Sequence, residues 1–142
     1  MIFEQFYLEC LSHASYLVGD TTTGTAVVVD PQRDIQQYLD RAQELDLTIT
    51  FVLETHFHAD FLSGHLELAK ATGATICYGA AARPQFPARL LEDNERLVLG
   101  DVVIETRLTP GHTPESTSYV VYEHAGDTVP YGVLTGDTLF IG

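Results

Sequence analysis

One short segment of the chain reads Glu54-Thr55-His56-Phe57-His58-Ala59-Asp60-Phe61, directly after a strand-like apolar run at residues 49–53. An extended backbone sends alternate residues to one side, so His56, His58 and Asp60 can converge on one point. Imidazole and carboxylate ligands suit zinc, iron or manganese rather than calcium, which prefers an all-oxygen shell. A polar loop whose histidines bond to backbone would explain a single histidine, but the cluster favours a metal site.

Two later segments offer ligands that the first one lacks. Residues 109–114 read Thr-Pro-Gly-His-Thr-Pro and present His112 on a turn, after an expected strand at 102–108. Residues 135–138 read Thr-Gly-Asp-Thr and place Asp137 after another apolar run, 131–134. Ligands at the ends of successive strands allow a sheet scaffold to gather a metal site from distant parts of a sequence.

In this order the motifs resemble the metallo-β-lactamase superfamily, whose pattern is His-x-His-x-Asp-His, then a distant His and a distant Asp. The segments around His56, His112 and Asp137 look most like its persulfide dioxygenase branch, which is related to glyoxalase II. The resemblance covers the whole chain. It implies an α/β (α+β) fold, the αββα sandwich of the superfamily, with residues 1–142 forming one domain.

One position departs from the family pattern. The superfamily's dinuclear members have a second His directly after the Asp of the first motif, and this chain has Phe61, which cannot ligate a metal. By resemblance, the remaining metal ligands are His56, His112 and Asp137. His58 and Asp60 then become catalytic-site neighbours that orient the ligands and tune their basicity. Two histidines and one carboxylate with open positions are typical of non-haem Fe(II) enzymes that use oxygen.

The resemblance and Phe61 together imply a mononuclear Fe(II) sulfur dioxygenase. Its substrates would be O2 and glutathione persulfide, or a similar low-molecular-weight thiol persulfide, and its product sulfite. The alternative is a zinc-dependent thioester hydrolase of the glyoxalase II type, which Phe61 disfavours because hydrolysis often uses two metals. A third hypothesis is a non-catalytic fragment that assembles without turnover.

Superfamily domains are normally larger, so the resemblance implies that this chain holds the N-terminal half to two-thirds of the sandwich and is C-terminally truncated. Strands meant to pair with an absent segment would present open edges. Leu139, Phe140 and Ile141 should not remain in water. We therefore expect a homo-oligomer in which another chain covers this end. Some bacterial members of the branch carry rhodanese domains downstream, so the resemblance makes a rhodanese domain possible in the full-length chain.

The composition is acidic, because 20 Asp and Glu against 7 Lys and Arg give a net charge of −13. Nucleic-acid binding needs a basic footprint, and attraction to an anionic membrane is also disfavoured. The sequence has no run of 18 apolar residues and no charged-then-apolar leader. We therefore expect a cytoplasmic protein with neither a membrane span nor a nucleic-acid partner.

The apolar pattern predicts strands that interleave with two helices. The strands are expected at 2–10, 15–18, 25–29, 48–53, 75–78, 95–99, 102–108, 117–122 and 131–134. The helices are expected at 34–45, with Asp34 as cap, and at 63–72, with Ser63 as cap and Gly73 ending the helix. Residues 80–92, with two prolines, are expected to form a long loop.

The other reactive side chains receive weaker interpretations. His65 is expected in a surface or capping role and His124 in solvent, whereas a site role for His13 stays open. Cys10 and Cys77 lie in apolar contexts and are expected to be buried thiols rather than a disulfide. Three tyrosines are expected in the core or at its rim: Tyr16, Tyr119 and Tyr122.

Overall fold

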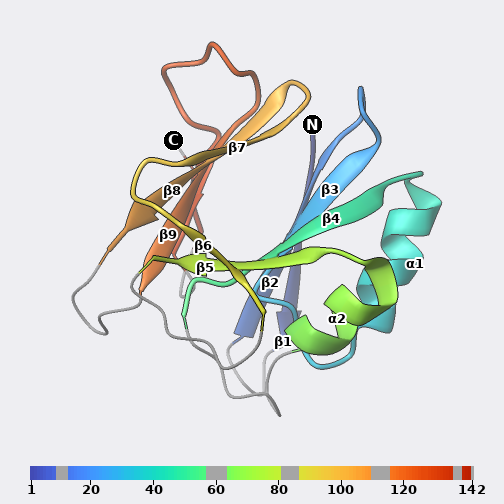
Figure 1. Ribbon diagram of the computed structural model, residues 1–142. Helices are drawn as coiled ribbons and strands as arrows, with labels where there is room; N and C mark the ends of the chain where they lie inside the picture. Colours follow the sequence, from blue (N-terminus) through green and yellow to red (C-terminus); the bar gives the residue numbers. More distant parts are fainter. Residues whose placement is uncertain (9–12, 57–63, 81–86, 110–115, 136–138, 142) are drawn as a thin grey trace.

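A computed structural model describes residues 1–8, 13–56, 64–80, 87–109, 116–135 and 139–141. In these ranges the chain forms two β-sheets packed face to face, and two helices cover the outer face of the first sheet (Figure 1). Three layers of the expected αββα sandwich are therefore present in the described part of the chain.

The first sheet collects strands from the first two-thirds of the chain, in the order β1-β2-β3-β4-β5-β6. Its strands are β1 (Ile2–Leu8), β2 (His13–Asp20), β3 (Thr25–Val29), β4 (Thr48–Leu53), β5 (Thr75–Gly79) and β6 (Arg89–Leu91). β1 to β3 are antiparallel neighbours, whereas β3 to β6 run parallel. The helices α1 (Gln36–Glu44) and α2 (His65–Thr72) connect β3 to β4 and β4 to β5. Because parallel strands end at the same edge, the residues that follow β3, β4 and β5 meet there.

The second sheet is antiparallel throughout and has the order β11-β10-β9-β8-β7. Its strands are β7 (Arg96–Leu99), β8 (Val102–Leu108), β9 (Thr117–Tyr122), β10 (Gly132–Leu134) and β11 (Leu139–Ile141). β7 and β8 form the predicted hairpin, in which Gly100 adopts a left-handed conformation at φ 61°. Glycine reaches this region without the steric penalty of a Cβ atom.

The core has two compartments because the first sheet is covered on both faces. Val27 and Val29 of β3 pack toward the second sheet, whereas Ala26 and Val28 pack toward the helices. A strand buried on both faces needs apolar residues at every position, so β3 lacks the polar alternation of a half-exposed strand.

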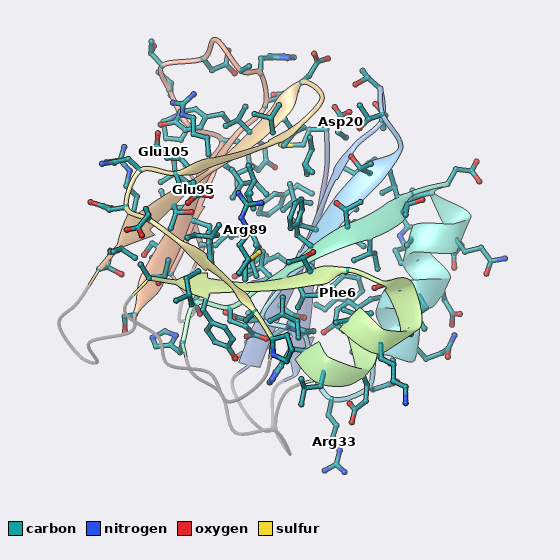
Figure 2. All side chains as sticks on the ribbon, in the orientation of Figure 1. Phe6, Asp20, Arg33, Arg89, Glu95 and Glu105 are labelled. Atoms are coloured by element: carbon teal, nitrogen blue, oxygen red, sulfur yellow. The ribbon has the colours of Figure 1, made fainter. Side chains whose placement is uncertain are left out.

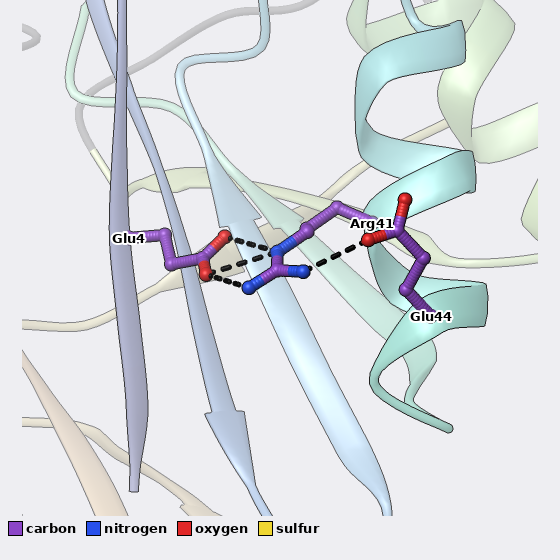
Figure 3. Close-up of polar contacts among 3 residues, drawn as sticks. All are labelled: Glu4, Arg41 and Glu44. Carbon is purple, nitrogen blue, oxygen red and sulfur yellow. Dashed lines mark hydrogen bonds and ion pairs between the residues drawn. The ribbon is translucent and has the colours of Figure 1, made fainter.

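Helix α1 packs against the first sheet through the apolar stripe that its sequence pattern provides, Ile35, Leu39, Ala42 and Leu45, to which the structure adds Tyr38. Tyr38 and Ala42 are buried against the first sheet. On the same helix, the Arg41 guanidinium contacts both carboxylate oxygens of Glu4 on β1, the shortest contact being 2.6 Å from Nη2 to Oε1, and also reaches Glu44 (Figure 3). Solvent screens these partly exposed ion pairs, so the packing of the stripe contributes more to stability than they do.

Several element boundaries differ from the sequence prediction. The expected loop at 80–92 contains β6, and the end of the chain contains β11; each strand has three residues, too few for a periodic signal. Helix α1 begins at Gln36, and Ile35 rather than the predicted Asp34 occupies the N-cap position. The backbone N–H of Gln36 nevertheless donates to Oδ1 of Asp34 at 3.2 Å. Gly73 ends α2 at φ 75°, as predicted, whereas Ser63 lies outside the described residues.

β11 pairs with β10 of the same chain. This pairing lies within one chain and does not test whether a second chain covers this end, so that expectation stays a prediction. Among the described residues, no helix has the length and apolarity needed to cross a membrane.

Candidate metal site

The proposed ligand His56 lies at the carboxyl edge of the parallel strands, three residues after β4 ends. Its side chain is partly exposed. The other proposed site residues are His58, Asp60, His112 and Asp137, and all four lie outside the described residues. Phe61 lies outside them as well. Within the described ranges no group of three or more His, Cys, Asp or Glu side chains could hold a metal ion. The ligand set therefore stays a prediction, and the structure tests the surroundings of His56.

The backbone just before His56 is fixed by both sheets. The N–H of Glu54 donates to the carbonyl oxygen of Cys77 on β5 at 3.0 Å. The carbonyl oxygen of Glu54 accepts a hydrogen bond from the Tyr119 hydroxyl on β9 at 2.8 Å. Burial raises the pKa of Tyr119 well above its ordinary value, and the negative charge of Asp30 adds to this effect, so the hydroxyl remains a donor.

Thr55 is held in the same way through its backbone. Its N–H donates to Oδ1 of Asp30 at 2.8 Å, and its carbonyl oxygen accepts from the N–H of Thr117 at 2.8 Å. The backbone groups of Glu54 and Thr55 are thus all hydrogen-bonded, with partners from β5, β9 and the end of β3. His56 therefore extends from a fixed dipeptide rather than from a loose loop.

The Thr55 side chain links Asp30 to the His56 ring. Thr55 Oγ1 lies 2.5 Å from Oδ2 of Asp30 and 2.9 Å from Nδ1 of His56. An ionised carboxylate only accepts, so the single hydroxyl hydrogen goes to Asp30, and Oγ1 accepts from Nδ1–H of His56. This tautomer places the ring's lone pair on Nε2, the nitrogen that would bind a metal. The donor chemistry therefore fits a metal ligand at His56.

Asp30 adopts an unusual backbone conformation to make these contacts. It is 1% exposed and has φ 52°, in the left-handed region that non-glycine residues rarely occupy. Its own N–H donates to the carbonyl oxygen of Leu53 at 2.8 Å. Such a conformation costs on the order of 1 kcal/mol and persists where the surrounding bonds determine it. Sequence reasoning gave Asp30 no role, although a lone carboxylate at the end of an apolar strand was a usable signal.

Two further buried polar residues were also missed. His65 and Glu54 are both 0% exposed, and Nδ1 of His65 lies 3.4 Å from Oε1 of Glu54. The prediction of a surface or capping role for His65 is therefore wrong. A polar side chain at the end of β4, directly before the metal motif, was a sign that Glu54 belongs to the surroundings of the site.

The remaining predictions concern cysteines, histidines and tyrosines outside the proposed ligand set. Cys77 is buried, as predicted, and burial raises its pKa to about 12, so it stays a thiol at neutral pH. His124 lies in an exposed turn, as predicted. Cys10 and the side chain of His13 lie outside the described residues. Tyr16, Tyr119 and Tyr122 are buried in the core, as predicted.

The chain belongs to the metallo-β-lactamase superfamily, because the model of that family matches residues 8–142. It is 34% identical over 139 residues to the cytoplasmic hydroxyacylglutathione hydrolase of Arabidopsis thaliana, covering 96% of this chain and 53% of the relative. It is 31% identical over 135 residues to the mitochondrial persulfide dioxygenase ETHE1 of Bos taurus, covering 89% and 48% of the two chains. These relatives place it in the glyoxalase II and ETHE1-like branch of the superfamily.

Comparison of structures gives the same fold. A metallo-β-lactamase from Staphylococcus aureus superposes with a TM-score of 0.85 and 38% sequence identity, over 95% of this chain and 42% of that one. The chain spans about half the length of the curated relatives it matches. Membership of the superfamily is thereby established, and both a hydrolase and a dioxygenase are found among these relatives.

Proposed function

We propose that this chain is part of a mononuclear iron sulfur dioxygenase that oxidises glutathione persulfide, or a similar small thiol persulfide, to sulfite. The observation that carries the proposal is Phe61, which directly follows Asp60 in the sequence. Dinuclear superfamily members have a histidine at this position that binds the second metal. Phenylalanine cannot bind a metal, so a second metal site in this chain would lack that ligand. The two histidines and one carboxylate that remain are suited to Fe(II) with open positions.

The described residues support this proposal through the environment of His56. The Asp30–Thr55–His56 chain of hydrogen bonds fixes the ring and its tautomer before any metal binds. His112 and Asp137 would complete the ligand set. When bound, the iron would supply the sites at which the persulfide sulfur and O2 meet. The chain's own residues would hold the ligands in position and, through the bonded Glu54-Thr55 backbone, keep His56 from moving away.

A zinc-dependent thioester hydrolase is the second candidate. It is favoured by the similarity to the Arabidopsis hydroxyacylglutathione hydrolase and to a probable zinc-dependent hydrolase of polyketide biosynthesis from Bacillus velezensis. The described geometry around His56 suits zinc as well as iron, since imidazole binds both. Phe61 remains the feature that separates the two candidates. For either activity we propose a cytoplasmic location, in keeping with the acidic composition.

The test combines metal analysis with two activity assays on the natural full-length protein, purified without oxygen. We expect about one iron per chain, uptake of O2 with glutathione persulfide, and formation of sulfite. A matched His56→Ala variant should lose both the iron and the activity, whereas His124→Ala, in the exposed turn, should keep them. Hydrolysis of a glutathione thioester without O2 uptake would contradict the dioxygenase and support the hydrolase.

A further inference from the structure

A buried pair of polar side chains joins the strand before the metal motif to the helix after it. Nδ1 of His65 lies 3.4 Å from Oε1 of Glu54, and neither side chain is exposed to solvent. Glu54 follows β4, and His65 is the first residue of α2. Buried polar groups are costly unless they contact polar partners, so this contact favours keeping β4 and α2 together.

The position of the pair in the sequence gives it significance. The residues between Glu54 and His65 include the proposed ligand His56 and its neighbours His58 and Asp60. The pair therefore joins the two ends of the segment that carries the first metal motif. Fixing both ends of a short segment removes much of its conformational freedom before a ligand binds.

Other contacts hold the same two ends together. The N–H of Gly64 donates to the carbonyl oxygen of Pro31 at 3.2 Å. A Cβ atom on Gly64 would lie 2.4 Å from the carbonyl oxygen of Gln32, so only glycine permits this approach. The neighbouring Asp30 side chain holds Thr55 at the other end. The turn after β3 thus contacts both ends of the metal-motif segment.

The His65 ring is also packed from the side of the first sheet. The ring of Tyr78 on β5, which is 1% exposed, meets it edge to face with 6.4 Å between ring centroids and 81° between planes. Aromatic packing of this kind helps to hold the plane of the ring. In this position Nδ1 of His65 faces the Glu54 carboxylate.

We propose that Glu54 and His65 form a positioning pair that sets the metal affinity of the site by fixing the two ends of the segment that carries His56. The inference rests on the proposed function only in taking His56 as a metal ligand. It holds for iron or zinc, and for a dioxygenase or a hydrolase.

The first test compares two substitutions of His65 in the full-length protein. His65→Leu removes the polar contact, whereas His65→Asn keeps a nitrogen donor near the position of Nδ1. Affinities for Zn(II) and Co(II) are measured by competition with a chelator. We expect His65→Leu to bind each metal at least about tenfold more weakly and His65→Asn to remain within about threefold of the parent. The same two substitutions at the exposed His124 are the matched controls and should change nothing.

A second variant separates metal affinity from folding. His65→Leu alone leaves the Glu54 carboxyl buried without this contact and can prevent folding. In E54M/H65L both partners become apolar, a change that is often neutral for stability. We expect this variant to unfold at a temperature close to that of the parent and still to bind metal at least about tenfold more weakly.

The outcomes divide clearly. Parent-like metal affinity in E54M/H65L, or equal losses in His65→Asn and His65→Leu, would overturn the positioning role. A parent protein that takes up neither metal would also overturn it, because no affinity would then exist to be set. A lack of O2 uptake with metal affinities as expected would refute the dioxygenase and leave this inference standing.

Discussion

The hydroxyl group of Tyr119 donates a hydrogen bond to the carbonyl oxygen of Glu54 over 2.8 Å, across the interface between the two sheets. Both residues are 0% exposed, so the sheets exclude solvent from this bond. The contact lies two residues before His56. The second sheet therefore helps to position the proposed ligand, although His56 follows a strand of the first sheet.

The first prediction removes this hydroxyl. Tyr119→Phe keeps the ring and its packing but leaves the Glu54 carbonyl oxygen without that donor. We expect the free energy of unfolding to fall by about 1–3 kcal/mol, as measured by urea denaturation. Tyr7→Phe, at a ring that is 56% exposed, is the control and should have little effect. Equal stability of the two variants would show that the Tyr119 bond does not matter.

The second prediction concerns the Thr55 hydroxyl. Thr55→Val keeps the shape of the side chain but cannot donate to Asp30 or accept from Nδ1 of His56. We expect metal affinity to fall by about 10–100-fold, since partners that orient a metal-binding histidine have effects of this size. Thr55→Ser retains the hydroxyl and should keep most of the affinity. The proposed tautomer of His56 is wrong if valine and serine behave alike.

The third prediction tests the role of Phe61 in metal stoichiometry. We expect one metal per chain in the parent protein, measured by elemental analysis. Phe61→His restores the ligand that dinuclear superfamily members have at this position, so the metal content should rise above one per chain. Phe61→Leu, which also cannot ligate, is the control and should remain at one. Two metals in the parent would refute the mononuclear site and favour the hydrolase.

The fourth prediction is a dependence of stability on pH through Asp20, at the end of β2 (Figure 2). Burial alone would raise its pKa, but hydrogen bonds from Thr22, Thr23 and the N–H of Asp101 outweigh burial and lower it to about 2. A folded-state pKa below the ordinary value of 3.8 means that the ionised form stabilises the fold above about pH 4. This stabilisation is lost as the pH falls toward 2.

The variant Asp20→Asn provides the measurement for Asp20. Its deficit in unfolding free energy relative to the parent should be largest above about pH 4 and should shrink toward pH 2, followed by urea denaturation at each pH. Asp127→Asn, at a partly exposed turn, is a useful comparison. A deficit that does not change between pH 2 and 6 would contradict the role of the Asp20 charge.

The fifth prediction concerns the close approach of β5 to β9. A Cβ atom on Gly79 would lie 2.1 Å from Oγ1 of Thr117 and 2.9 Å from Cδ2 of Leu108. Gly79→Ala should therefore lower the free energy of unfolding by about 1–3 kcal/mol through overpacking. Gly126→Ala, where an added Cβ meets nothing within 4 Å, is the matched control. Thermal unfolding measures both, and no difference between them would contradict the approach.

Much of the first sheet and both of its helices could be predicted from the sequence, because long apolar runs, helical stripes and a glycine after a helix carry strong local signals. The stripe of α1 and the end of α2 at Gly73 are examples. β6 and β11 could not be predicted in this way. Each has only three residues, and their assignment depends on pairing with β5 and β10 rather than on their own pattern.

The site was predictable only in part, for a related reason. The motif around His56 is local, so the sequence identifies it directly. The Glu54–His65 contact depends instead on two buried polar side chains that meet only after β4 and α2 have packed. Nothing in the immediate neighbours of His65 distinguishes a buried histidine from a surface one.

The hydrogen bonds behind His56 also bear on the order of folding. Tyr119 and Glu54 are separated by 65 positions in the chain, and their bond requires two sheets that form from different parts of the sequence. Contacts of such long range close late, because the entropy of a large loop must be overcome first. The hydrogen bonds that position His56 should therefore form late in folding. Metal would bind the assembled native state rather than nucleate it, and would slow unfolding more than it accelerates folding.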